Sequence, residues 1–150
     1  MIYIILFVGL VLDQFTKYIA LTQLKGANSI VIIKDWLEFT YVENTGVAFG
    51  SFSGYKYFFI VVAIIAFIFI NFYIYKNKDK IPKIEQILFI LIACGALGNA
   101  IDRILYSYVI DFIHTKIGGL YDFPVFNFAD IYISVSCILM IIISFFKKEK

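Results

Sequence analysis

The sequence predicts an all-α membrane protein with four transmembrane helices and a short β-hairpin in its first long loop. Three observations predict this fold class. Of the 150 residues, 62% are hydrophobic and 16% are charged, whereas soluble domains average about 45 to 50% apolar and about 25% charged residues. The mean hydropathy is +0.90, and the apolar residues gather in long runs. A water-soluble globule is therefore excluded, because too little polar surface remains to cover it.

Four apolar runs are long enough to cross a bilayer, whose hydrocarbon core of about 30 Å needs about 20 helical residues. They cover approximately residues 2–21, 57–75, 84–105 and 128–146. Because these spans make up most of the chain, we expect a single membrane-embedded domain over residues 1–150.

The distribution of basic residues predicts the orientation of the spans. Seven of the 13 Lys and Arg residues lie in the link between the second and third spans and in the C-terminal tail. They are Lys76, Lys78, Lys80, Lys83, Lys147, Lys148 and Lys150. The positive-inside rule therefore predicts cytoplasmic termini and two outer loops, at about residues 22–56 and 106–127.

The two outer loops differ in character. In the first, the β-prone runs 30–33 and 37–42 are separated by Lys34-Asp35-Trp36, which predicts a hairpin. In the second, Gly118-Gly119 and Pro124 prevent one continuous helix from joining the third and fourth spans.

The composition argues against several functions. A net charge of +2 is too mild to indicate a nucleic-acid partner. Cys94 and Cys137 lie inside apolar runs, which is typical of buried free thiols, so we expect no metal site and no cofactor. His114 has no evident Ser or Cys partner for a nucleophilic triad.

Polar residues of three spans converge at the level of the outer leaflet. These residues are Asp13, Gln14 and Lys17 in the first span, Asn99, Asp102 and Arg103 in the third, and Asn127 and Asp130 at the start of the fourth. An isolated ionisable group at membrane depth costs about 2.5 to 3.5 kcal/mol. Such a cluster therefore indicates mutual pairing or a functional use.

Several of these residues also have a structural explanation. Asp13 and Lys17 are spaced i, i+4 on one helical face, so we expect an ion pair that braces the site. Arg103 is expected to pair with a carboxylate or to meet a phospholipid phosphate. Asn127 is typical of an N-cap, with Asp130 as the acid of a capping box.

Asp111 and Asp130 form a candidate pair of carboxylates, each flanked by apolar residues. Two carboxylates in a poorly solvated place share a proton, so one can act as a base toward water and the other as an acid toward a carbonyl oxygen. This is the chemistry of aspartic proteases. Intramembrane carboxylates also serve proton and ion carriers, and composition alone leaves both possibilities open.

Five motifs follow one another along the chain. They are Asp13-Gln14-Phe15-Thr16-Lys17, Asn44-Thr45-Gly46-Val47-Ala48-Phe49, Gly95-Ala96-Leu97-Gly98-Asn99-Ala100-Ile101-Asp102-Arg103, Val109-Ile110-Asp111-Phe112 and Phe126-Asn127-Phe128-Ala129-Asp130. In these motifs the sequence resembles lipoprotein signal peptidase, the bacterial signal peptidase II family of membrane aspartyl proteases. The resemblance covers nearly the whole chain.

The resemblance implies that Asp111 and Asp130 are the catalytic dyad, and that the first outer loop forms a small extracytoplasmic β-cradle on the membrane. Residues expected to bind substrate or support the site are Asn44, Gly46, Gly98, Asn99, Arg103, Asn127 and Ala129, together with Asp13, Gln14 and Lys17. Cys94 departs from the family, which usually has a glycine there, and this predicts a local change in the packing of the third span.

The resemblance further implies a prolipoprotein substrate in the bacterial cytoplasmic membrane, cleaved just before a cysteine that carries a diacylglyceryl group. We expect contact with membrane phospholipid and function as a monomer. A carrier would need polar residues toward the cytoplasmic face, where the spans offer little beyond Asn71, Ser134, Ser136 and Ser144. A non-catalytic lipoprotein-binding subunit would not need both carboxylates.

Overall fold

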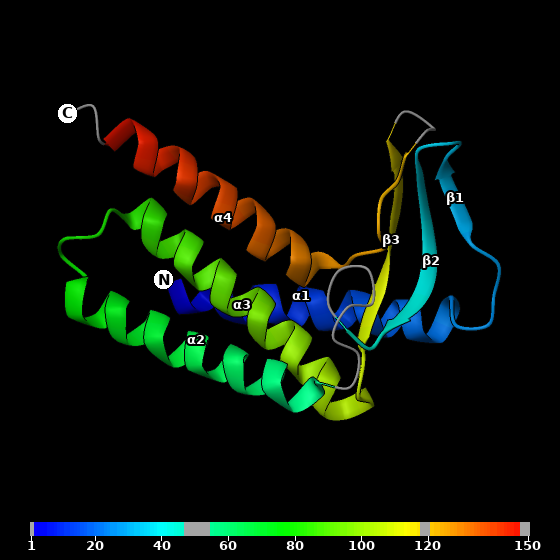
Figure 1. Cartoon of the computed structure of the whole chain (residues 1–150), viewed down its shortest axis with the longest axis horizontal. Helices are drawn as coiled ribbons and strands as arrows, with labels where there is room; N and C mark the ends of the chain where they lie inside the picture. The colour runs from blue at the N-terminus through cyan, green and yellow to red at the C-terminus, as the bar shows by residue number, and fades with distance from the viewer. Residues whose placement is uncertain (1, 47–54, 118–120, 148–150) are drawn as a thin grey trace.

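The computed structural model describes residues 2–46, 55–117 and 121–147. Within these ranges, a bundle of four helices carries a small sheet at one end (Figure 1). The helices are α1 (Ile2–Gln23), α2 (Lys56–Asn77), α3 (Lys83–Tyr106) and α4 (Phe128–Lys147). The strands are β1 (Ile30–Ile33), β2 (Leu37–Asn44), β3 (Val109–Ile117) and β4 (Tyr121–Asp122).

The predicted fold class is confirmed, because the four described helices are each long and apolar enough to cross a membrane. They extend up to two residues beyond the expected spans, as in α2, expected at 57–75 and found at Lys56–Asn77. Some residues of the sequence analysis lie outside the described ranges. These are Val47, Ala48 and Phe49 of the second motif, the Gly118-Gly119 pair, Lys148 and Lys150.

Helix α3 is the centre of the bundle, because α1, α2 and α4 each pack against it. Half of its most apolar stretch is buried inside the protein, compared with 17% in α1, 17% in α2 and 11% in α4. The outer helices instead expose large apolar side chains such as Phe7, Phe69 and Phe145. A bilayer solvates such surfaces, so α3 is the helix best placed to carry buried polar groups.

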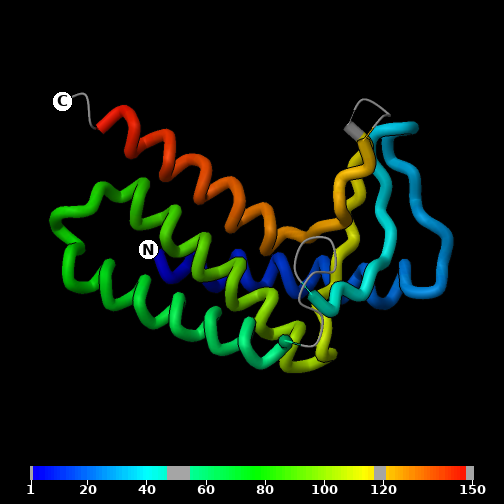
Figure 2. Tube along the Cα trace, viewed as in Figure 1, coloured from blue at the N-terminus to red at the C-terminus, as the bar shows by residue number. Residues whose placement is uncertain are grey.

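The helix ends divide the molecule into two poles. The start of α1, the α2–α3 link and the end of α4 lie at one pole, and the sheet lies at the other (Figure 2). This arrangement is the one expected for four consecutive spans.

The sheet is larger than the predicted hairpin. Its strand order in the described chain is β1-β2-β3-β4, with antiparallel neighbours. Strand β3 comes from the second outer loop, where the sequence analysis expected no strand. Asp111 and His114 interrupt the apolar pattern of this segment, but its β-branched residues pair along β2 in a register that sets Val42 opposite Asp111.

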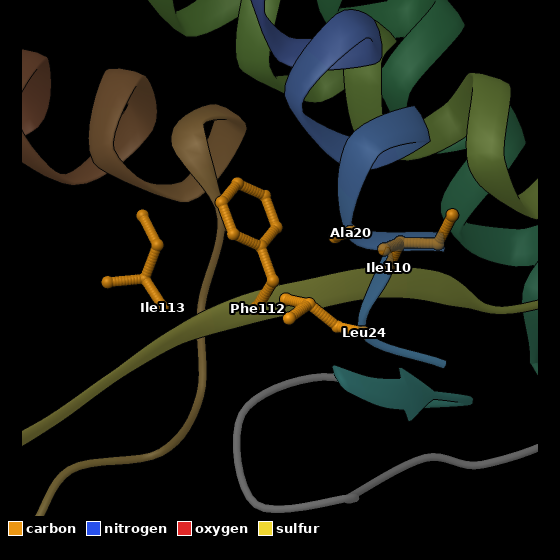
Figure 3. Close-up of a cluster of buried hydrophobic side chains, with 5 residues drawn as sticks. All are labelled: Ala20, Leu24, Ile110, Phe112 and Ile113. Atoms are coloured by element: carbon orange, nitrogen blue, oxygen red, sulfur yellow. The ribbon is translucent and has the colours of Figure 1, made fainter. Parts of the chain in front are cut away.

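An apolar cluster fixes the sheet on the bundle. Ala20 and Leu24 at the end of α1 pack against Ile110, Phe112 and Ile113 of β3 (Figure 3). The chain then returns to β3 just before α4, since the Phe126 N–H donates to the Ile113 carbonyl over 3.0 Å. Asp111 and the first turn of α4 are thereby brought close together.

Close contacts between helices depend on glycines, which have no side chain. A Cβ at Gly95 of α3 would lie 2.3 Å from the Ala129 carbonyl oxygen of α4. Cys94, which is completely buried, faces Gly9 of α1, where an added Cβ would lie 2.8 Å from its Sγ. The space for the Cys94 side chain is thus provided by a glycine on the neighbouring helix.

Candidate active site

A cleft of about 560 Å³ opens between the sheet, α3 and α4. Its polar lining residues are Asn44, Gly46, Asn99, Arg103, Asp111, Asp130 and Ser134. Its apolar walls are Val109, Phe123, Pro124, Val125, Phe126, Ile131, Ile133 and Val135. The two candidate carboxylates therefore share one cleft, which is apolar over most of its surface.

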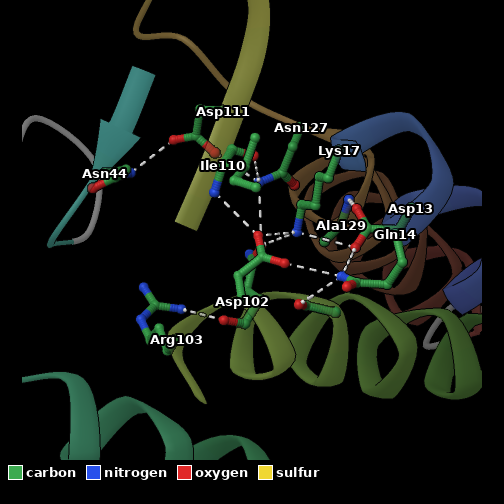
Figure 4. Close-up of polar contacts among 12 residues, drawn as sticks. Asp13, Gln14, Lys17, Asn44, Asp102, Arg103, Ile110, Asp111, Asn127 and Ala129 are labelled. Carbon is green, nitrogen blue, oxygen red and sulfur yellow. Dashed lines mark hydrogen bonds and ion pairs between the residues drawn. The ribbon is translucent and has the colours of Figure 1, made fainter. Parts of the chain in front are cut away.

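Asp111 stands on β3 with only 2% of its surface exposed. Its carboxylate accepts hydrogen bonds from Asn44 Nδ2 over 2.8 Å and from Asn127 Nδ2 over 2.7 Å (Figure 4). Burial, together with the nearby charge of Asp130, raises the pKa of Asp111 to about 7. Near neutral pH, Asp111 therefore holds a proton for a large part of the time.

Asp130 lies in the first turn of α4. Its carboxylate accepts hydrogen bonds from Asn99 Nδ2 over 2.8 Å and from the Asn127 N–H over 3.1 Å. Asn127 Oδ1 in turn accepts the Asp130 N–H over 3.0 Å, so the predicted capping box is confirmed. The Asp130 carboxylate is thus held by two hydrogen-bond donors at the N-terminus of α4.

Lys17 is the centre of a buried ion cluster behind the cleft. Its ammonium lies 3.0 Å from Asp13 Oδ2, which confirms the predicted ion pair, and 2.9 Å from Asp102 Oδ2. It also donates to Asn99 Oδ1 over 2.9 Å. Because an ammonium can only donate, Asn99 must turn its oxygen to Lys17 and its NH₂ group to Asp130.

The two carboxylates of this cluster also hold backbone groups next to the catalytic candidates. Asp13 Oδ1 accepts the Ala129 N–H and Asp102 Oδ2 accepts the Ile110 N–H, both over 3.0 Å. Each of these backbone groups directly precedes Asp130 or Asp111 in the chain. The ion cluster thus ties α1 and α3 to the two segments that carry the candidate pair.

Gln14 and Gly98 complete the cluster. Gln14 Nε2 donates to Asp102 Oδ1 over 3.0 Å and to the Gly98 carbonyl over 3.2 Å. A Cβ at Gly98 would lie 2.5 Å from Asp13 Oδ2, so α1 approaches α3 this closely only because residue 98 has no side chain.

Arg103 lines the cleft without the expected carboxylate partner, because no Asp or Glu of the described chain forms an ion pair with it. Its guanidinium donates to the Gly46 carbonyl over 2.9 Å and to the Asn99 carbonyl over 3.2 Å. It also lies 5.0 Å from the ring centroid of Phe59. These contacts hold the segment after β2 against α3.

The structure separates the predicted site residues into two groups. Those that line the cleft are Asn44, Gly46, Asn99, Arg103, Asp111 and Asp130. Those that support it from behind are Asp13, Gln14, Lys17, Gly98, Asn127 and Ala129. His114 contacts Glu38 in the sheet, with 2.7 Å between Nδ1 and Oε1, and does not line the cleft.

The sequence analysis did not assign site roles to Asp102 or to the apolar walls of the cleft. Asp102 belongs to the third of the five motifs, but the sequence alone does not indicate that its side chain faces α1. Ser134 was noted only as a polar residue of the fourth span. Its i, i+4 spacing from Asp130 was the signal that placed it on the same face of the helix.

Comparison with known proteins identifies the family. The sequence pattern described as Signal peptidase (SPase) II matches residues 5–146. The chain is 45% identical to a lipoprotein signal peptidase of Clostridium tetani, over 93% of this chain and 88% of that protein. It is 39% identical to the lipoprotein signal peptidase of Fusobacterium nucleatum, over 100% and 90% of the two chains.

A solved structure agrees with these relatives. It is described as a bacterial membrane enzyme determined by the in meso method at 2.3 Å resolution. The TM-score is 0.88 at 38% sequence identity, with 99% of this chain and 89% of that chain covered. On these grounds the chain belongs to the signal peptidase II family.

Proposed function

We propose that this chain is a membrane aspartic endopeptidase that removes signal peptides from prolipoproteins, with Asp111 and Asp130 as its catalytic pair. The observation that carries the assignment of the pair is that both carboxylates line one cleft and are joined through Asn127. Membership of the signal peptidase II family makes the chain a peptidase, and its relatives are named for lipoprotein signal peptides.

In the first step, a water molecule between the two carboxyl groups attacks the carbonyl carbon of the scissile peptide bond. The Asp130 carboxylate takes a proton from this water, while the protonated Asp111 gives its proton to the carbonyl oxygen. The product is a neutral tetrahedral diol. The raised pKa of Asp111 and the hydrogen-bond donors around Asp130 support this division of roles. Because the two carboxyl groups interact, their titration is a property of the pair and not of either residue alone.

In the second step, the diol collapses and the C–N bond breaks. Asp130 returns its proton to the leaving nitrogen, and Asp111 takes back a proton from a diol hydroxyl. Both carboxyl groups thereby regain their starting protonation states. No other acid or base is required.

The substrate is a prolipoprotein whose cysteine already carries a diacylglyceryl group, and the bond broken is the one just before that cysteine. The apolar walls of the cleft suit acyl chains, and its polar end holds the carboxylates. A substrate anchored by its signal helix and acyl chains presents this bond only near the headgroup level. We therefore place the sheet and the cleft at the outer leaflet of the bacterial cytoplasmic membrane, in contact with phospholipid, with both termini cytoplasmic.

The chain works as a single membrane-embedded domain and as a monomer, since all the proposed site residues come from one chain. The alternative of a proton or ion carrier is not supported, because the relatives are named as peptidases. Away from the cleft, Asn71 of α2 donates to the Phe67 carbonyl of its own helix over 2.7 Å.

The test is cleavage of a purified diacylglyceryl-modified precursor by wild type, Asp111→Asn, Asp130→Asn and the double variant. Each single substitution should lower turnover by about 10²- to 10⁴-fold, the usual contribution of a general acid or base. The double variant should be no worse, because the two groups act as a unit. Full cleavage by either single variant would exclude the two-carboxylate mechanism, and an unlipidated precursor cleaved as fast as the lipidated one would exclude the substrate assignment.

A further inference from the structure

Ser134 occupies a distinct position in the cleft. It follows Asp130 by four residues on α4, which places it about 6 Å further along the helix axis, toward the pole opposite the sheet. Both residues line the same cleft, and Ile131, Ile133 and Val135 surround Ser134 on the α4 wall. Ser134 is exposed, so its hydroxyl is an accessible polar group beside apolar residues of the cleft wall, one helical turn from Asp130.

The Ser134 hydroxyl has no hydrogen-bond partner among the described residues. Two threonines of α1 each donate to a carbonyl four residues earlier in the helix. Thr16 donates to Leu12 over 2.9 Å, and Thr22 donates to Tyr18 over 3.0 Å. Ser134 does not make this contact, so its donor remains available to a molecule in the cleft.

The other polar side chains of the cleft are already bonded within the protein. Asn44 and Asn99 donate to the two catalytic carboxylates, and Arg103 donates to two backbone carbonyls. When a substrate covers the exposed Ser134 hydroxyl, this group needs an acceptor in place of its solvent contacts. Carbonyl oxygens are the acceptors that a lipidated peptide brings to this depth, in its acyl esters and in the backbone of its signal segment.

We propose that Ser134 is a specificity-determining residue that donates a hydrogen bond to a carbonyl oxygen of the bound substrate, one helical turn deeper than the scissile bond. The inference rests on the proposed function and adds a substrate contact to it. The carbonyl belongs either to an acyl ester of the diacylglyceryl group or to the signal-peptide backbone. These two sources share one chemistry and are separated by the choice of substrate.

The experiment compares Ser134→Ala with wild type on two precursors, one with ester-linked chains and one with ether-linked chains that lack the carbonyl oxygens. Ser134→Ala should lower kcat/KM about 2- to 10-fold, the effect of one lost hydrogen bond, mainly through a higher KM. Ser134→Thr keeps the hydroxyl and should restore most of the activity. Ser136→Ala is the matched control, because Ser136 is on the same helix, is also unpartnered, is buried and does not line the cleft.

A lower kcat/KM of Ser134→Ala on the ester precursor alone assigns the contact to an acyl ester. An equal decrease in kcat/KM on both precursors assigns it to the peptide backbone. Ser134→Ala with wild-type kinetics on both precursors would overturn the inference, and so would an equal defect in Ser134→Thr. The melting temperature of Ser134→Ala in detergent should equal that of wild type, which separates a lost contact from a damaged fold. Failure here leaves the peptidase assignment intact, whereas normal cleavage by Asp130→Asn would refute the proposed dyad whatever Ser134 does.

Discussion

Asn44 is the residue through which the protonation of Asp111 can be tested by mutation. It stands at the end of β2 and donates a hydrogen bond from Nδ2 to Asp111 Oδ2 over 2.8 Å. This bond favours the charged carboxylate, so it lowers the pKa of Asp111 against the larger effect of burial, which raises it. Replacing Asn44 with Leu removes the hydrogen-bond donor and puts an apolar side chain of similar size in its place.

The expected shift follows from the strength of the lost bond. A hydrogen bond to a charged group contributes about 1.5 to 3 kcal/mol, and one pKa unit corresponds to about 1.4 kcal/mol. Asn44→Leu should therefore raise the pKa of Asp111 from about 7 by about one to two units. In the proposed mechanism Asp111 must be protonated before attack, so the alkaline limb of the kcat/KM profile should move upward by the same amount.

The assay is the pH dependence of kcat/KM for a lipidated precursor without histidine, measured from about pH 5 to about pH 9, because this ratio reports ionisations of the free enzyme. Glu43→Gln is the matched control on the same strand, since Glu43 pairs with Lys25 over 2.8 Å and lies outside the cleft. His114→Gln tests the single histidine of the chain. Both controls should leave the alkaline limb in place.

Two results would refute this reasoning. An alkaline limb that stays in place or moves downward in Asn44→Leu would show that Asp111 does not carry the essential proton. An alkaline limb that disappears in His114→Gln would assign the ionisation to His114 and not to Asp111. A lower rate at the optimum is compatible with the mechanism, because Asn44 also positions Asp111.

Three further outcomes are expected. Asp13→Ala leaves part of the buried ion cluster unpaired, at a cost of about 3 to 5 kcal/mol, so it should lower the melting temperature together with activity; an inactive protein of unchanged stability would contradict a bracing role. Single cysteines at Lys78 and Lys34 should react with an impermeant thiol reagent from opposite sides of the membrane, and labelling from one side would contradict the topology. Gly9→Ala should lower the melting temperature, and Cys94→Gly should restore it; no restoration would contradict their direct contact.

Much of the site follows from rules that act within one helix. The i, i+4 spacing predicts the ion pair of Asp13 with Lys17, and the spacing of three predicts the capping box of Asn127 with Asp130. These contacts depend only on helix geometry, so they can be read along the chain. Hydropathy predicts the spans in the same way, because the bilayer thickness sets the length of an apolar helix.

Contacts between elements are decided by the tertiary structure. No spacing rule indicates that Asp102 reaches across to Lys17, or that Arg103 binds a backbone carbonyl after β2. Strand β3 was missed because its polar residues break the apolar pattern, and its pairing with β2 joins segments far apart in sequence. Such contacts depend on how closely helices approach and how strands align, and these are properties of the packed chain.

The sequence by itself thus determined the four spans and the level at which polar residues gather, and through the family motifs it predicts which two carboxylates form the catalytic pair. Only the tertiary structure decided how they are held, with Asp111 between two asparagine donors on a strand and Asp130 between α3 and the start of α4. The physical reason is that hydropathy and helix geometry act locally. The protonation of a buried carboxyl depends instead on every donor, charge and apolar wall that the folded chain brings around it.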